Sequence, residues 1–132
     1  MTTPLNTERR IAGMCMLMPK DTNHHGVIFG GRVMAEIDLA GAVEAMRYTN
    51  FEVVTRYVNG IEFKYPIQVG DQVTLYARLV KLGRTSLTIQ VEVEACRPGQ
   101  DSVISVIAAE VVYVTVQRRG NSMFTVPHGV TL

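Results

Sequence analysis

Residues 30–48 read GGRVMAEIDLAGAVEAMRY, and this stretch decides the fold. It contains no proline, and Ala, Met, Val, Ile and Leu dominate it from Arg32 to Tyr48, which predicts a helix over that range. Its apolar positions go most of the way around the helix, and only Glu36, Asp38 and Glu44 carry charge in the central turns. Because a helix that is apolar on nearly all sides is typically buried, we expect the rest of the chain to pack around it.

Outside this helix, apolar residues recur at every second position, which is the period of a β-strand. About five or six strands are expected, over 10–18, 51–57, 58–65, 72–79, 85–94 and 102–116. Short turns join the later strands, and strands joined in this way pair antiparallel. The sequence therefore predicts an α+β fold, a single domain over 1–132 with its core at about 10–116 and a tail at 117–132. One curved antiparallel sheet wrapped around one long buried helix is the hotdog arrangement.

The composition excludes several classes of protein. Hydrophobic residues make up 47% and charged residues 19% of the chain, which argues against intrinsic disorder. The net charge of +1 offers no basic excess for nucleic acid, and no apolar run reaches the roughly 20 residues that span a membrane. Cys15 and Cys96 are too few for a disulfide framework, so we expect reduced thiols and a cytoplasmic protein. Met14, Met16 and Met18 alternate on the first strand and are expected in the core.

The glycine pair at the helix start is the first candidate for chemistry. The first backbone N–H groups of a helix have no acceptor within it, and the helix dipole favours negative charge there. Gly30 and Gly31 carry no side chain that would block a ligand, so their amides form a candidate oxyanion hole. The alternative is that the pair only makes a tight turn into the helix.

Asp38 is the second candidate, because it stands in the middle of the apolar helix. A buried carboxylate is costly without a partner, and such groups gather in active sites as general bases or nucleophiles. The alternative is a solvated stripe shared with Glu36 or Glu44. Gly30 lies eight residues before Asp38, which is about 12 Å along a helix at 1.5 Å per residue. One carbonyl group can therefore meet both only if they come from two subunits of a dimer.

Two polar segments add further candidates. Asn23 precedes the glycines, and its amide can donate to or accept from a substrate or water, although a turn is the commoner role for asparagine. A basic turn between two strands could hold phosphate or be a solvated hairpin. This turn consists of Gly83, Arg84, Thr85 and Ser86, with Lys81 beside it. The histidines and cysteines match no zinc spacing, so no metal site is expected.

The motifs around these candidates resemble a known family. MPKDTN at 18–23, IFGG at 28–31 and IDLAGA at 37–42 resemble the hotdog acyl-CoA thioesterases of the YciA and brain acyl-CoA hydrolase type. Further segments agree, namely IEF at 61–63, VGD at 69–71, YAR at 76–78 and GRTS at 83–86. The resemblance covers about residues 10–116, and the tail matches only loosely.

The resemblance implies an enzyme of fatty acid metabolism that hydrolyses acyl-CoA to a free carboxylic acid and coenzyme A. It assigns the catalytic aspartate to Asp38, the loop asparagine to Asn23 and the helix-start glycines to Gly30 and Gly31. It also implies that Asn23 and Asp38 meet across a dimer interface. It also implies a homohexamer built as a trimer of dimers, and it brings the basic turn near the pantetheine and phosphates of coenzyme A. No cofactor is expected, since coenzyme A is part of the substrate and product.

Two other functions stay open at this point. One is a hotdog dehydratase acting on 3-hydroxyacyl thioesters, which would use a catalytic histidine; no histidine lies in the helix, and His24 and His25 are in the loop before it. The other is a non-catalytic acyl-CoA sensor, against which Asn23 and Asp38 argue. The sequence leaves both roles of Asp38 open, general base and nucleophile.

Overall fold

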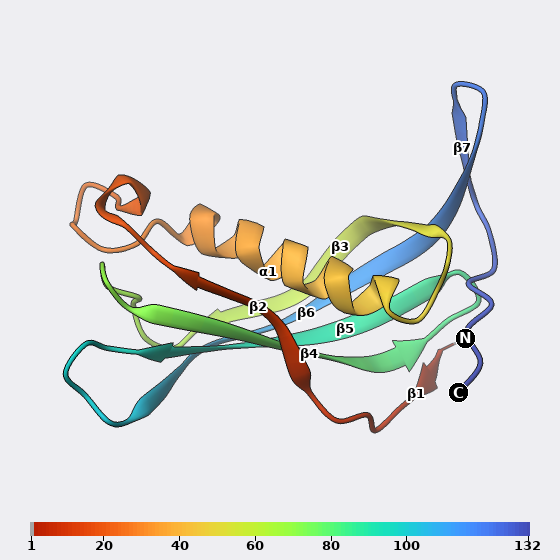
Figure 1. Cartoon of the computed structure of the whole chain (residues 1–132). Coiled ribbons are helices and arrows are strands. Elements are labelled where there is room, and N and C mark those ends of the chain that lie inside the picture. The colour runs from red at the N-terminus through yellow and green to blue at the C-terminus, as the bar shows by residue number, and fades with distance from the viewer. Residues whose placement is uncertain (1) are drawn as a thin grey trace.

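The computed structural model describes residues 2–132, which form one long helix, one 3-10 helix and seven strands (Figure 1). In chain order the elements are β1 (Thr3–Pro4), β2 (Arg10–Met16), the 3-10 helix η1 (Pro19–Asp21), α1 (Gly30–Met46), β3 (Glu52–Phe63), β4 (Gln72–Leu82), β5 (Ser86–Cys96), β6 (Val103–Arg119) and β7 (Ser122–Thr125). The helix lies across one face of a single sheet.

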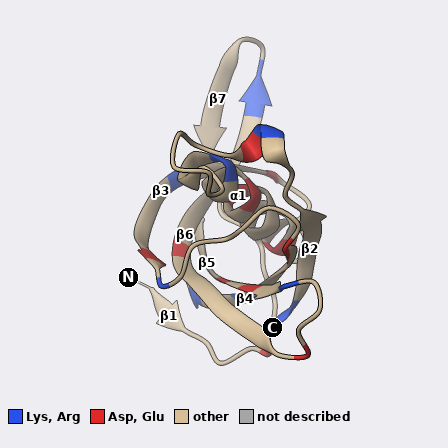
Figure 2. Ribbon diagram, turned by 90° about the vertical axis from the view of Figure 1, so that its left-hand side faces the viewer, with Lys and Arg blue, Asp and Glu red and all other residues tan. Residues whose placement is uncertain are grey.

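The strands pair antiparallel throughout this sheet. Their order is β1–β4–β5–β6–β3, with β2 also beside β4 and β7 beside β6. Seen along the helix axis, β2 and β3 flank α1 while β4, β5 and β6 lie beneath it, so the sheet curves around the helix (Figure 2). The predicted α+β hotdog architecture is confirmed.

The core follows the alternation of the sequence. Every second side chain of the central strands points toward α1 and is 1% exposed or less, namely Val73, Leu75, Ala77 and Leu79 on β4 and Leu87, Ile89, Val91 and Val93 on β5. On the helix, Val33 and Ile37 join the same cluster. Burial of an aliphatic side chain contributes about 1.5–3 kcal/mol, so these strands supply much of the stability that holds α1 in place.

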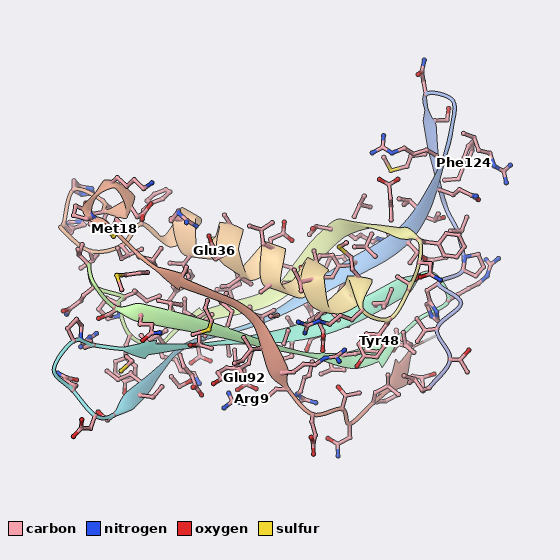
Figure 3. The ribbon with its side chains drawn as sticks, viewed as in Figure 1. Arg9, Met18, Glu36, Tyr48, Glu92 and Phe124 are labelled. Atoms are coloured by element: carbon pink, nitrogen blue, oxygen red, sulfur yellow. The ribbon has the colours of Figure 1, made fainter. Side chains whose placement is uncertain are left out.

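The strands differ from their prediction in three respects. The two strands predicted at 51–57 and 58–65 form the single strand β3, because shifts in register around Thr55 and Gly60 absorb the irregularity without a turn. The sheet has seven strands instead of five or six, since the short β1 and β7 were not expected. The residues at 117–132, expected as a tail, include the end of β6 and all of β7, which form a hairpin that projects beyond the sheet and carries Phe124 (Figure 3).

The helix also differs from its prediction. It begins two residues earlier than expected and ends at Met46, because the next two amides bond to carbonyls three residues back and tighten the last turn. Its covered face consists of Val33, Ile37, Ala40, Gly41, Glu44 and Ala45. Its exposed face carries the side chains of Met34, Ala35, Asp38, Leu39, Val43 and Met46, and Leu39 is 61% exposed. The prediction that α1 is buried on nearly all sides is therefore wrong for the single chain.

The methionines of the first strand region are exposed as well. Met14, Met16 and Met18 are 58%, 59% and 47% exposed, so their predicted place in the core is wrong. The inward positions of β2 are taken by smaller residues, since a Cβ on Gly13 would contact Leu75 and Ala40. Met18 lies at the bend before η1 (Figure 3). Among residues 2–132, the helices are all too short or too polar to cross a membrane.

Candidate active site

Asp38 lies in the middle of α1 and is held by two strands, β3 at the side of the helix and β6 beneath it. Thr55 Oγ1 on β3 donates a hydrogen bond to Asp38 Oδ1 at 2.6 Å. The Tyr113 hydroxyl on β6 donates to the Asp38 backbone oxygen at 2.6 Å and lies 3.3 Å from Oδ1. Asp38 Oδ2 has no hydrogen-bond partner among residues 2–132, and the side chain is exposed. The chain thus fixes one carboxylate oxygen and leaves the other open.

Thr55 and Tyr113 were not predicted as site residues from the sequence. They are directly opposite each other in the ladder between β3 and β6, which brings both next to Asp38. Tyr113 is 1% exposed in a valine-rich run, and a buried tyrosine needs a partner for its hydroxyl, so a signal was available. Thr55 gave no such signal, because threonine is an ordinary strand residue. Burial, and then the nearby charge of Asp38, raises the pKa of Tyr113, so its hydroxyl remains a protonated donor.

The glycine pair forms the first turn of α1. The amides of Arg32 and Val33 donate to the Phe29 carbonyl at 3.0 and 3.4 Å, whereas those of Gly30 and Gly31 have no acceptor among residues 2–132. A Cβ on Gly31 would come within 2.5 Å of the Phe29 ring, so a side chain there would displace that ring. The helix start therefore presents two free donors, as an oxyanion hole requires.

A cavity of about 310 Å³ opens beside these donors. Gly30 lies at its edge, and its walls are mainly apolar, formed by Ile28, Val33, Phe63, Ile67 and Ile107. Pockets of this size and character hold small apolar ligand groups. The cavity therefore suits a hydrocarbon chain whose polar end meets the helix start.

Asn23 makes a turn and keeps one donor free. Its Oδ1 accepts from the His25 amide at 2.9 Å and from the Val27 amide at 3.4 Å. Its Nδ2 group has no partner among residues 2–132, so Asn23 can act on a ligand only as a donor. A bridge between Thr22 and Ile28 folds this loop back toward the start of α1. Asn23 can therefore form the turn with its Oδ1 and still donate to a substrate or water from its Nδ2.

The other acidic residues of α1 have different surroundings. Both carboxylate oxygens of Glu44, a 0% exposed side chain, accept from Arg10 Nε, at 2.9 and 3.1 Å, and Oε1 also accepts from Arg47 at 3.0 Å. Glu36 is half-buried and pairs with Arg32. Asp38 therefore does not share a solvated stripe with either residue.

The basic turn lies at the other end of the helix from Asn23. Figure 1 shows the β4–β5 turn near the end of α1, whereas the loop before the helix lies at its start. The Gly83 amide donates to the Ser86 carbonyl at 2.9 Å and closes the turn. Lys81 pairs with Glu110 at 3.6 Å, so Arg84, which has no ion pair among residues 2–132, is the cation available in this turn.

The arrangement brings together some of the predicted residues and separates others. Asn23 gathers with the glycine pair at the start of α1, while Asp38 lies about 12 Å along the helix at 1.5 Å per residue. Among residues 2–132, no group of three or more His, Cys, Asp and Glu side chains is placed to hold a metal ion. The single chain thus offers amide donors at the start of α1 and a carboxylate in the middle of the same helix.

Comparisons with known proteins identify the family. The family model described as the thioesterase superfamily matches residues 25–101. The acyl-CoA thioester hydrolase YciA of Salmonella typhimurium is 45% identical over 94 residues, which cover 70% of this chain and 71% of that protein.

Solved structures of related proteins agree. A hexameric hotdog fold thioesterase of Campylobacter jejuni superposes with a TM-score of 0.80 at 35% identity and covers 92% of this chain and 90% of its own. A hexameric thioesterase from Yersinia pestis superposes with a TM-score of 0.82 at 34% identity, and the match covers 97% of this chain and 100% of that protein's chain. This chain therefore belongs to the thioesterase superfamily, as a hotdog-fold relative of the YciA acyl-CoA thioester hydrolases, which confirms the family predicted from its motifs.

Proposed function

We propose that this protein hydrolyses acyl-CoA thioesters to a free carboxylic acid and coenzyme A. The observation that carries the proposal is the Asp38 carboxylate, whose Oδ1 is held by Thr55 while Oδ2 has no partner among residues 2–132. A carboxylate fixed at one oxygen and open at the other can take a proton from water or attack a carbonyl carbon. The relatives named acyl-CoA thioester hydrolases support the same reaction.

The complete site requires two subunits. Asp38 is too far along α1 to reach a carbonyl bound at Gly30 of the same chain. The exposed face of α1 is apolar around Asp38, and the outer edge of β3 carries no strand among residues 2–132. Both surfaces suit a two-fold interface in which each helix start faces the partner's helix. The hexameric relatives support a homohexamer, which three such dimers would form.

The reaction follows from this arrangement. The thioester oxygen accepts hydrogen bonds from the Gly30 and Gly31 amides, which stabilise the negative charge that develops on it. Water attacks the carbonyl carbon as Asp38 of the partner subunit takes its proton, the C–S bond breaks, and coenzyme A leaves as a thiolate that recovers the proton. In the alternative route Asp38 attacks directly, and water then hydrolyses the resulting anhydride. Asn23 donates from Nδ2 to the water or the carbonyl oxygen.

The two ends of the substrate have separate places. The cavity beside Gly30, with its apolar walls, would hold the acyl chain next to the thioester. The basic turn would hold the pantetheine and phosphates, with Arg84 as the available cation.

The test is thiol release from a panel of acyl-CoAs of increasing chain length, with Asp38→Asn as the matched control. We expect kcat/KM to rise with chain length as long as each added methylene is buried, which contributes about 0.8 kcal/mol, and then to level off. The control should release no thiol above background. Binding of acyl-CoA without any thiol release would instead favour a sensor.

A further inference from the structure

The buried hydroxyl of Tyr113 reaches the backbone of α1. It lies 2.6 Å from the Asp38 backbone oxygen and 3.3 Å from Oδ1, and it has no other acceptor among residues 2–132. The amide four residues after Asp38, that of Ala42, also forms a hydrogen bond with this hydroxyl, so the hydroxyl lies between that amide and the Asp38 carbonyl. The single proton of the hydroxyl is therefore directed at Asp38 alone.

Gly41 makes this approach possible. A Cβ at this position would overlap the Tyr113 hydroxyl and come within 2.9 Å of ring atoms Cε2 and Cζ. Glycine inside a helix destabilises the helix relative to alanine. The chain thus has a weaker helix former at the one turn where the hydroxyl meets Asp38.

Two donors from two strands converge on the same carboxylate. Thr55 donates to Oδ1 at 2.6 Å from β3, and Tyr113 approaches it from the opposite position on β6. Thr55 holds only the carboxylate, whereas Tyr113 also holds the backbone from which that carboxylate extends. The side-chain torsion of Asp38 and the position of its backbone are thus restrained separately. The two restraints together hold Asp38 Oδ2 in a single orientation.

We propose that Tyr113 is a positioning residue that fixes Asp38 so that Oδ2 points at the substrate. The proposal rests on the proposed function, in which Asp38 is the general base or the nucleophile. A displacement of a reacting group by about 1 Å can reduce a rate on the order of 10²-fold. Because Tyr113 is buried and does not reach the substrate, its effect falls on kcat and not on substrate binding.

The principal variant is Tyr113→Phe, which removes one oxygen atom and keeps the ring. We expect kcat to fall about tenfold or more while KM stays within about twofold. Thr88→Val is the matched control, since it removes another buried hydroxyl from the neighbouring strand β5, and both constants should stay unchanged. Gly41→Ala is a second variant, which keeps the tyrosine but displaces its hydroxyl, and it should lower kcat in the same way.

Two outcomes of the kinetics would overturn the proposal, namely a wild-type kcat in Tyr113→Phe, or an equal loss in Thr88→Val. If Tyr113→Phe does not fold, Gly41→Ala answers the same question with the tyrosine retained. A crystal structure of the variant gives a readout independent of activity, because the Asp38 carboxylate should leave its wild-type position, and an unmoved carboxylate counts against the proposal. A wild-type protein without thiol release would refute the proposed function, while the crystallographic comparison would still decide the role of Tyr113.

Discussion

Helix α1 carries an acidic residue on each of its two faces, and the two residues use their hydrogen-bonding capacity differently. Glu44 is fully buried, and both of its carboxylate oxygens accept hydrogen bonds from Arg10 or Arg47. Asp38 is exposed, with Oδ1 held by Thr55 and Oδ2 open. A carboxylate that is satisfied within the chain stabilises the fold, whereas one with an open oxygen can take a proton. The open acceptor, and not burial, therefore identifies the reactive acid.

The largest effect is expected from Asp38→Asn. The amide can still accept from Thr55, so the fold is preserved, but it can neither take a proton from water nor attack a carbonyl. We expect kcat to fall by about 10³-fold or more, while coenzyme A binding and the thermal midpoint stay close to wild type. Steady-state kinetics measure kcat, calorimetry measures coenzyme A binding, and thermal unfolding measures the midpoint. Turnover close to that of the wild type would make Asp38 a bystander and end the contrast with Glu44.

The second prediction concerns the apolar surroundings of Asp38. Leu39→Lys places a charge on a side chain that is 61% exposed in the single chain and buried in the proposed dimer. Because the two-fold axis repeats the change, two lysines would be desolvated per interface, and we expect dissociation with a loss of activity of about 10²-fold or more. Light scattering after gel filtration measures the mass. Gln100→Lys, in the exposed loop between β5 and β6, is the control and should leave the assembly intact. An intact and active oligomer of Leu39→Lys would place the interface elsewhere.

The same contrast shows what the sequence could and could not predict. Alternation placed Leu75 and Ile89 in the core correctly, because strand period and burial are local properties. The helical pattern located α1 but treated it as buried all round, since hydrophobicity does not distinguish a core from a subunit interface. The motifs singled out Asp38, but Thr55 and Tyr113 reach it only through the pairing of β3 with β6, which no local pattern records.

The third prediction concerns the covered face. Glu44→Gln removes the charge that Arg10 and Arg47 neutralise and replaces one acceptor oxygen by a donor that faces guanidinium groups. Hydrogen bonds to charged groups contribute about 1.5–3 kcal/mol, so we expect the free energy of unfolding to fall by about 2 kcal/mol. Denaturant unfolding measures this change. The kcat of the folded protein should stay at the wild-type value, and a loss of kcat without a loss of stability would contradict a purely structural role for Glu44.

The smallest effect is expected for Asp21, an acid that is satisfied like Glu44 but lies nearer the surface. Its Oδ2 accepts from the Met18 amide at 2.9 Å and its Oδ1 from Arg32 at 3.2 Å. The hydrogen bond from Met18, and then the charge of Arg32, lowers the pKa of Asp21 from its ordinary value of 3.8.

A lowered pKa in the folded state means that the unfolded chain binds the proton more readily, so Asp21 stabilises the fold above its ordinary pKa and loses this effect as the pH falls through the lowered one. Asp21→Asn should therefore unfold at a slightly lower temperature than the wild type at neutral pH, and the gap should close below about pH 3.8. Thermal unfolding over a pH series measures it. The gap should be smaller than that for Glu44→Gln because solvent screens an ion pair near the surface. A gap that persists in acid would mean that Asp21 acts through packing and not through its charge, and only Glu44 would then represent the stabilising class of acid.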